Sequence, residues 1–291
     1  MKDKKNYLLT FISVLFSFYL CEFYLNFNDH FFYNSYQKKL NYFSIQKNNK
    51  PFDFRSSFKY LNDNKQEYPN AVLLTSPKFD DKNKILALAG ISKKTNICCN
   101  ELGYYMVYES DRYGFNNPDL VWKNKHIDYL LIGDSFVHGN SVNRPNDIAS
   151  IMALEKKVIN LGYPGTGPLH QLAVIKEYFL PSKKILWFFY EGNDLNELKE
   201  ELNDNYLKKY LENDFKQELK FKQNLIDDYM LNEFNKFSNK ILQEENANNQ
   251  NKDKYIKLKQ TLKIYKLRLF IKKIFQKEYE YKKISKINYN I

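Results

Sequence analysis

The sequence predicts an α/β fold built on a parallel sheet. Apolar runs typical of strands alternate with segments of helical pattern, in the order strand 128–132, helix 145–156, strand 157–161, helix 168–179 and strand 184–190. Strands that alternate with helices in this way indicate right-handed βαβ units. In open sheets of this kind ligands bind at the carboxyl ends of the strands. The residues that follow each strand are therefore the first place to look for a site.

Glycine and proline are absent from the last third of the chain. All nine glycines lie between Gly90 and Gly192, and the last proline is Pro181. Because these two residue types mark turns and break helices, the stretch after Gly192 is expected to be largely helical. It cannot build a compact α/β domain by itself.

An apolar segment follows three lysines at the N-terminus. Residues 7–25 are mostly apolar, interrupted by Glu22, and as a helix they nearly span a hydrocarbon core of about 30 Å. The lysines place that end in the cytoplasm, and no small-residue cleavage site follows the apolar run. We expect an uncleaved, single-pass signal anchor that exports the rest of the chain. A cleaved signal peptide and a buried helix of a soluble protein are the alternatives.

The region between the anchor and the core has a mixed pattern. Residues 28–70 are polar and aromatic without clear periodicity, and we expect a stalk or a loosely packed lead-in there. Short strands are expected at 84–91 and 104–108, as a hairpin, and a turn-rich loop at 111–118. The expected organisation is a membrane anchor at 1–27, a lead-in at 28–107, an α/β core at 108–200 and a helical extension with a basic tail at 201–291.

The net charge of +11 comes almost entirely from the C-terminal end. Residues 251–291 hold thirteen Lys and Arg against three Asp and Glu, so the remainder is close to neutral. A basic tail on a neutral body, without a nucleic-acid-binding module, argues against nucleic acid as a partner. Apolar residues at helical spacing in 256–275 predict an amphipathic helix that packs on the core. A helix on an anionic membrane surface or one that grips an acidic glycan are the alternatives.

Three cysteines occur, Cys21, Cys98 and Cys99, without the spacing of a metal site. A disulfide between adjacent residues is strained, so Cys98 and Cys99 are interpreted as ordinary thiols. No metal or other cofactor is expected.

Gly133-Asp134-Ser135 directly follows the first strand of the core. Gly133 permits a tight strand-to-helix turn. Ser135 would then begin a helix, where backbone N–H groups favour a developing negative charge. Simple capping of the helix by Asp134 or Ser135 is the alternative.

The second and third strands of the core are followed by further amide donors. Gly162 and Gly165 follow the second strand, and Gly192-Asn193-Asp194 follows the third. A backbone N–H near the glycines and the Asn193 side chain could stabilise an oxyanion, although each segment could also be turn chemistry. Three such segments in order, each at a strand end, favour a serine site over turns alone.

Over about residues 108–200 these segments resemble the SGNH (GDSL-type) hydrolases. The nucleophile of that family lies in a Gly-Asp-Ser segment, which implies that role for Ser135. The oxyanion glycine is best matched by Gly165, with Gly162 as the second choice, and the oxyanion asparagine by Asn193. The family has Gly-x-Asn-Asp where this chain has Gly192-Asn193-Asp194, so the spacer residue is missing.

The resemblance implies a flavodoxin-like three-layer α/β/α fold and cleavage or transfer of an acyl ester without a cofactor. The loop at 111–118 and the segment at 187–194 look like a membrane-associated bacterial subgroup, whose members often belong to envelope polysaccharide systems. We therefore expect a serine esterase or O-acyltransferase acting on an O-acylated envelope carbohydrate. It would sit in the bacterial inner membrane with the α/β domain on the periplasmic or extracellular side. Envelope-assembly proteins are the expected partners.

One part of the family pattern is missing. SGNH enzymes complete the catalytic triad with Asp-x-x-His, and this sequence contains no such motif. The fold is therefore expected to be incomplete relative to the family, and the base to be absent unless His138 or His170, which could line the crevice, replaces it. The carboxylates of Asp134, Glu191 and Asp194 are expected to support the serine turn rather than to act as an acid–base pair.

Two alternative functions remain. The first is a non-catalytic pseudoenzyme subunit that binds glycan or protein partners in envelope polysaccharide assembly. The second is a membrane-tethered helical protein in which the three segments are turns only.

Overall fold

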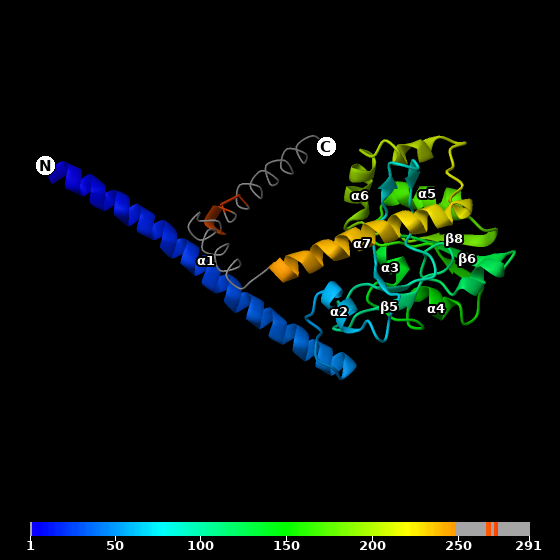
Figure 1. The fold of residues 1–291 in the computed structure, drawn as a ribbon, viewed down its shortest axis with the longest axis horizontal. Coiled ribbons are helices and arrows are strands. Elements are labelled where there is room, and N and C mark those ends of the chain that lie inside the picture. The colour runs from blue at the N-terminus through cyan, green and yellow to red at the C-terminus, as the bar shows by residue number, and fades with distance from the viewer. Residues whose placement is uncertain (1, 248–265, 269–270, 273–291) are drawn as a thin grey trace, which may run out of the picture. The chain divides into compact units, whose positions relative to one another are not determined.

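The structure, a computed structural model, describes residues 2–247, 266–268 and 271–272. It divides into two compact units, one of residues 1–43 with 241–291 and one of residues 44–240. The second unit contains helices and every described strand (Figure 1). The predicted amphipathic helix at 256–275 lies mostly outside the described residues, as does the rest of the basic tail.

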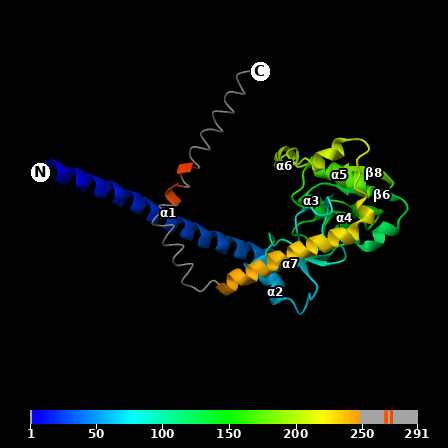
Figure 2. The same cartoon turned by 45° about the horizontal axis from the view of Figure 1, so that its top comes forward.

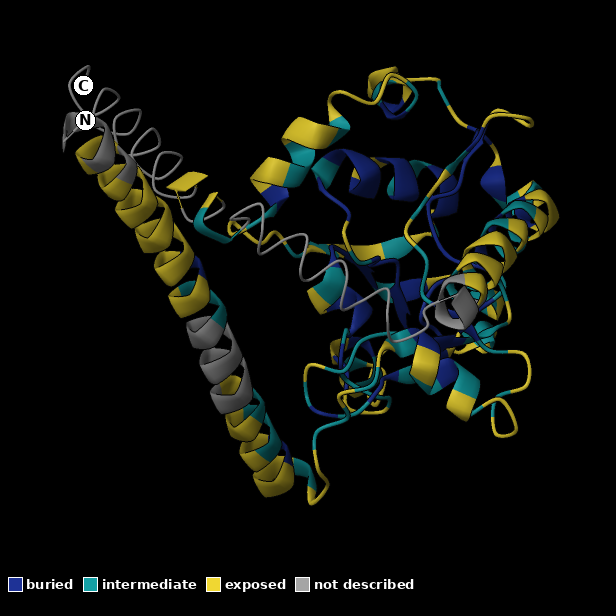
Figure 3. Cartoon of the chain, turned by 60° about the vertical axis from the view of Figure 1, so that its left-hand side comes forward, coloured by how far each residue is buried: buried dark blue, intermediate teal, exposed yellow. Residues whose placement is uncertain are grey.

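The N-terminal helix α1 runs from Lys2 to Asn48. Its window Leu9–Asn26 is long and apolar enough to cross a membrane, and most of the described side chains there are exposed (Figure 3). This agrees with the predicted apolar helix, while crossing itself stays a prediction. The structure differs from the expected irregular lead-in, because the helix continues to Asn48. The physical reason is local, since no glycine or proline occurs between residue 28 and Asn48.

Glu22 interrupts the apolar window and is nevertheless buried, with 1% of its surface exposed. Its carboxylate accepts hydrogen bonds from the backbone N–H groups of Lys266 and Leu267, at 3.0 and 2.7 Å. Burial of a polar group costs free energy unless it is hydrogen-bonded. The Glu22 carboxylate, which interrupts the apolar pattern of this helix, therefore has hydrogen-bond partners within the first unit.

The core of the second unit is a three-stranded parallel sheet of β6 (Ile127–Ile132), β7 (Val158–Asn160) and β8 (Ser182–Trp187), in the order β7-β6-β8. All three predicted strands are confirmed, as is their parallel pairing. Leu130 of the central strand lies opposite Ile159 and Ile185, and it is fully buried. A central strand that is apolar on both faces is typical of a parallel sheet covered on both sides.

Helices cover the two sides of this sheet (Figures 1 and 2). On one side α3 (Ser135–His138) and α4 (Ile148–Met152) pack on Leu131 through Val137 and Ala149. On the other side lies α5 (Pro168–Tyr178), whose bounds match the prediction within one residue. The α4 helix is shorter than the predicted 145–156, because Asp147 caps it by accepting the Ser150 N–H at 3.0 Å.

Short strands before the core form two small sheets. One contains β1 (Val72–Leu73), β4 (Thr95–Ile97) and β5 (Val107–Glu109), and the other pairs β2 (Phe79–Asp80) with β3 (Ile85–Leu86). The predicted hairpin between 84–91 and 104–108 is therefore wrong. Asp80 explains the pairing of β3 with β2, because its carboxylate accepts the Lys82 N–H at 3.0 Å and the Asn83 amide at 2.6 Å and so closes a tight turn.

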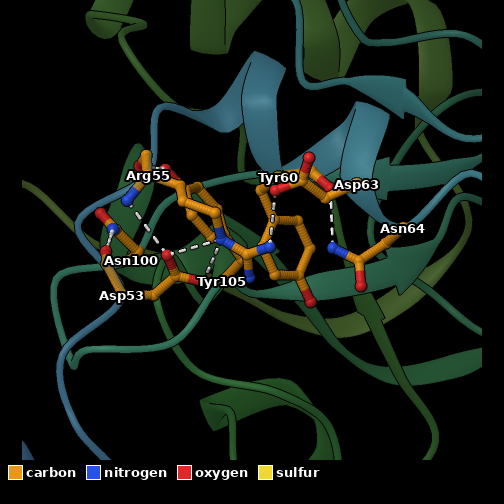
Figure 4. A network of polar contacts seen from close by, with 7 residues as sticks. All are labelled: Asp53, Arg55, Tyr60, Asp63, Asn64, Asn100 and Tyr105. Carbon is orange, nitrogen blue, oxygen red and sulfur yellow. Dashed lines mark hydrogen bonds and ion pairs between the residues drawn. The ribbon is translucent and has the colours of Figure 1, made fainter.

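Helix α2 (Ser57–Asp63) precedes these strands and begins at the capping residue Ser56. Beside it, Arg55 forms ion pairs with Asp53 at 2.6 Å and Asp63 at 3.0 Å. Tyr105 donates its hydroxyl to the Arg55 carbonyl at 2.5 Å, as Figure 4 shows. This network ties the start of the unit to the segment between β4 and β5.

The stretch after Gly192, predicted to be largely helical, is partly helical and belongs to the same compact unit as the core up to residue 240. It contains α6 (Asp194–Glu201), the 3-10 turns η2 (Leu207–Leu211) and η3 (Leu219–Phe221), and α7 (Gln223–Ala247); a further turn, η1 (Asp119–Lys123), precedes β6. Glu177 of α5 holds it in place. Its buried carboxylate accepts the Tyr210 hydroxyl at 2.8 Å and the backbone N–H groups of Gln217 and Leu219.

Candidate functional site

The three segments that follow the core strands meet at the carboxyl end of the sheet. Tyr163, which follows β7, donates its N–H to the Gly133 carbonyl after β6 at 3.2 Å. A Cβ atom placed on Gly133 would lie 2.9 Å from the Phe188 carbonyl, which follows β8. The chain therefore has no room for a side chain at Gly133, and the close approach of these segments requires glycine there.

Ser135 begins α3, directly after the capping residue Asp134. The Asp134 carboxylate accepts the Phe136 N–H at 3.0 Å through one oxygen. Its other oxygen lies 3.4 Å from Ser135 Oγ, which donates to it at the long end of the hydrogen-bond range. The Ser135 side chain is half-buried. The capping interpretation is thus correct for Asp134, and it leaves the serine hydroxyl at the start of the helix.

The two candidate oxyanion glycines differ in their surroundings. The Gly162 N–H is already donated to Asn160 Oδ1 at 2.9 Å, and a Cβ there would lie 2.7 Å from Val137 Cβ. Gly165 is exposed, has φ +68°, and faces open space within 4 Å of its Cβ position. Of the two, only Gly165 has room for a ligand beside it.

Asn193 and Asp194 stand at the start of α6. The Asn193 amide donates to Glu197 Oε1 at 2.9 Å. Asp194 is fully buried, and its Oδ2 accepts the Tyr190 N–H at 2.7 Å. Asn193 Oδ1, Asp194 Oδ1 and Glu197 Oε2 are buried without a hydrogen-bond partner in the described part of the chain. Unsatisfied buried acceptors are uncommon, and these three lie together at the start of α6.

The carboxylates near this site repel one another. Burial raises the pKa of Asp194, and the negative charge of Asp134 raises it further. Burial likewise raises the pKa of Glu197, with smaller contributions from Asp134 and Asp194. Among the described residues no group of three or more His, Cys, Asp or Glu side chains is arranged to hold a metal ion. Glu191, the third carboxylate considered from the sequence, is exposed.

The two histidines considered as substitutes for the base are buried and hydrogen-bonded to other parts of the protein. His138 contacts Asn140 Oδ1 through Nδ1 at 2.8 Å and the Tyr108 hydroxyl through Nε2 at 3.1 Å. His170 Nε2 lies 2.8 Å from the Leu88 carbonyl. Burial lowers the pKa of each histidine to about 4. Neither shares a hydrogen bond with Ser135, and their expected place in the crevice stays a prediction.

The loop at 111–118, predicted to be rich in turns, also supports the site. The buried Asp111 carboxylate accepts two backbone N–H groups, the Asn117 amide and the Trp122 indole N–H. Asn117 pairs its side chain with the backbone of Asn160 at 2.8 and 2.9 Å, and Asn116 donates to the His138 carbonyl at 2.8 Å. The loop therefore positions the end of β7 and the helix that carries Ser135. The dense run of Asp and Asn in the loop was the only sequence signal for this role.

A separate cavity, not expected from the sequence, surrounds Arg144. It measures about 730 Å³, and a second one of about 590 Å³ also borders Arg144. The larger cavity is lined by four tyrosines, by Lys50 and by Arg144, with no Asp or Glu in its wall. Burial lowers the pKa of Arg144, and no hydrogen bond or ion pair is described for its guanidinium group. The described wall of the larger cavity thus combines two basic side chains with four tyrosines.

Comparisons with protein-family models, with curated proteins and with solved structures found no match to this chain.

Proposed function

We propose that the protein is a membrane-anchored serine esterase or O-acyltransferase of SGNH type that acts on an O-acylated carbohydrate of the cell envelope. The observation that carries this proposal is the convergence of the segments bearing Ser135, Gly165 and Asn193 at one end of a parallel sheet. The strand order β7-β6-β8 supports it, because a flavodoxin-like sheet begins with the order 2-1-3.

In the proposed reaction Ser135 Oγ attacks the acyl carbonyl. The Ser135 and Gly165 N–H groups and the Asn193 amide donate to the oxyanion, for which the Asn193 amide must exchange its present acceptor, Glu197 Oε1. Each well-placed donor of this kind lowers the barrier by about 3 kcal/mol.

The described residues place no strong base beside the hydroxyl proton of Ser135. The only hydrogen bond described for Ser135 Oγ leads to the Asp134 carboxylate, 3.4 Å away, and a carboxylate is a much weaker base than a neutral imidazole. Loss of a triad base lowers the rate by several orders of magnitude. We expect the residues described to give slow acylation, detectable with a reactive ester or phosphonate.

A fluorophosphonate probe tests this proposal directly. We expect labelling of the full-length protein at Ser135, and its loss in Ser135→Ala. Ser150→Ala is the matched control, because Ser150 also lies in a first helical turn beside a capping aspartate, Asp147, and its labelling pattern should equal that of wild type. Absence of label on wild-type protein with a cooperative unfolding transition would exclude a reactive serine.

The cavity beside Arg144 favours a second candidate function, non-catalytic binding of an acidic glycan. Tyrosine rings and hydroxyls suit the faces and hydroxyls of sugars, and an unpaired guanidinium suits a carboxylate or phosphate. Titration with an acidic oligosaccharide should then show at least about tenfold weaker binding for Arg144→Gln. Lys84→Gln, which removes an exposed lysine outside the cavity, should bind as wild type does. Equal affinity of both variants would argue against this function.

A further inference from the structure

Cys98 and Cys99 form a pair at the end of β4 whose sulfur atoms lie 2.8 Å apart. Both thiols are free and partly exposed. Their backbone extends the ladder between β4 and β5, because the Cys98 N–H donates to the Met106 carbonyl at 3.0 Å and the Met106 N–H donates to the Cys99 carbonyl at 2.9 Å. Side chains of adjacent strand residues normally point to opposite faces, so contact between these two sulfurs is a specific feature of the segment.

The surroundings of the two thiols differ. Cys99 Sγ accepts the Ser141 N–H at 3.0 Å, whereas Cys98 Sγ lies 3.7 Å from the Asn140 side-chain oxygen. Hydrogen bonds from Cys98 and from the Ser141 N–H lower the pKa of Cys99, against the opposing effect of burial. The same interaction, together with burial, raises the pKa of Cys98. Cys99 is therefore the thiol with more thiolate at neutral pH, and thiolate is the reactive form.

The chain is held on both sides of the pair. Before it, β4 pairs with β1 and β5. After it, Asn100 donates its amide to the Asp53 carbonyl at 2.6 Å, within the network of Figure 4. The backbone on either side of the pair is thus fixed by its neighbours.

We propose that Cys98 and Cys99 are a reactive vicinal dithiol, which low-molecular-weight disulfides oxidise to a disulfide between the two, with Cys99 as the attacking thiol and Cys98 as the resolving thiol. The observation that carries it is the contact of the two sulfurs together with their unequal hydrogen bonding. This inference does not depend on the proposed acyl chemistry.

The reaction is a double thiol–disulfide exchange. The Cys99 thiolate attacks one sulfur of a disulfide RSSR, forming a Cys99–SR mixed disulfide and releasing RS⁻. Cys98 then gives up its proton and attacks Cys99 Sγ, which releases the second RS⁻. The two thiols of the protein are oxidised, RSSR is reduced to two RSH, and the two cysteine protons end on the released thiols. The sulfurs must move from 2.8 Å to a bond of about 2.05 Å.

Oxidation of the two thiols should also change the contacts of the helix that carries Ser135. The Asn140 side-chain oxygen that faces Cys98 also contacts His138 Nδ1 at 2.8 Å, and the Asn140 N–H donates to the Ser135 carbonyl at 3.0 Å. Formation of the disulfide moves Cys98 Sγ, which begins this chain of contacts. We expect faster amide hydrogen exchange at Asn140 and Ser141 in the oxidised protein.

Intact-mass measurement of the full-length protein in detergent tests the proposal, in a Cys21→Ser background that leaves only the pair. Oxidised glutathione should remove two hydrogens from the protein without adding glutathione. The reduced protein should bind phenylarsine oxide, which links two neighbouring thiols, in a one-to-one adduct, and prior oxidation should abolish this adduct. Recovery of only unmodified thiols under conditions that oxidise dithiothreitol completely would overturn the proposal.

The two single variants test the order of attack. Cys98→Ser should stop at a stable mixed disulfide, with one glutathione added at Cys99, because the resolving thiol is missing. Cys99→Ser should react at least about tenfold more slowly, because burial, which this variant does not change, still raises the pKa of Cys98 and keeps it mostly protonated at neutral pH. Equal rates for the two variants, or faster reaction of Cys99→Ser, would refute the assigned roles. None of these readouts depends on whether Ser135 reacts with a fluorophosphonate.

Discussion

At the scale of single residues, Gly162 and Gly165 show how two similar sequence positions come to differ. Both follow β7, and both are candidates for the oxyanion donor. Gly162 is enclosed by Val137 and by the His138 backbone N–H, which would lie 2.8 Å from an added Cβ. Gly165 meets nothing within 4 Å. The first glycine is therefore needed for close packing against α3, while the second is free to contact a ligand.

Alanine substitutions should separate the two glycines. Gly162→Ala forces α3 away from β7, and we expect it to lower the free energy of unfolding by about 2–4 kcal/mol. Gly165→Ala has space, and only its left-handed backbone, at φ +68°, costs about 1 kcal/mol. Urea unfolding of both variants measures these losses. Equal losses would contradict the packing role assigned to Gly162.

At the scale of elements, β8 is the least covered strand of the sheet. Ile185 and Trp187 of β8 are 45% and 56% exposed, and Phe189, two residues after the strand, is 46% exposed. This exposure is unexpected, because β8 pairs with the buried strand β6 along five residue pairs. Uncovered apolar residues along a strand attract other apolar groups.

Polar substitutions on this strand should reduce that attraction without unfolding the protein. We expect the pair Ile185→Thr and Phe189→Thr to lower the fluorescence of a bound apolar dye and to change the free energy of unfolding by less than about 1 kcal/mol. Ile159→Thr, at a fully buried position of β7, is the control and should cost about 2–4 kcal/mol. Unchanged dye binding in the double variant would show that Ile185 and Phe189 do not bind the dye.

At the scale of the whole molecule, buried ionisable groups make stability depend on pH. The pKa values of His138 and His170 are lowered to about 4, so the folded state binds fewer protons than the unfolded state between pH 6.5 and 4. Stability from these groups is present above pH 6.5 and is lost as pH falls. Burial raises the pKa of Asp111 to about 6, so this group acts in the opposite direction between pH 6 and 4.

The two histidines act against several carboxylates, since burial also raises the pKa of Asp194 and Glu197. A fully developed histidine shift of this size is worth roughly 3 kcal/mol between pH 6.5 and 4. His170→Gln keeps a donor for the Leu88 carbonyl but cannot titrate, and it should reduce the loss of stability over this range by about that amount. Urea unfolding at several pH values measures the slope. A slope unchanged in His170→Gln would contradict the assignment to this histidine.

Membrane insertion is also a property of the whole chain. If the Leu9–Asn26 window crosses the membrane, the full-length protein should stay in the membrane fraction at alkaline pH. Leu15→Lys combined with Phe16→Lys should release it, because each lysine at the centre of a span costs about 3 kcal/mol. Tyr36→Lys, on the same helix but outside the window, should leave the distribution unchanged.

The sequence alone determined the elements whose signals are local. Apolar periodicity gave β6, β7 and β8 and the α5 helix within a few residues, and the parallel pairing followed from their alternation with helices. The turn at Gly133-Asp134-Ser135 could be predicted for the same reason, because a glycine and a capping residue determine the backbone within a few positions of the chain.

Only the tertiary structure decided which distant groups meet. The docking of the extension on Glu177, the hydrogen bond of Asn117 to Asn160 and the enclosure of Gly162 by Val137 all join residues far apart in sequence. So does the contact of Cys98 with Asn140, which lies 42 positions away. These contacts form because buried polar groups find hydrogen-bond partners, and apolar surfaces pack together, once the sheet has formed. No local pattern of residues encodes which groups meet.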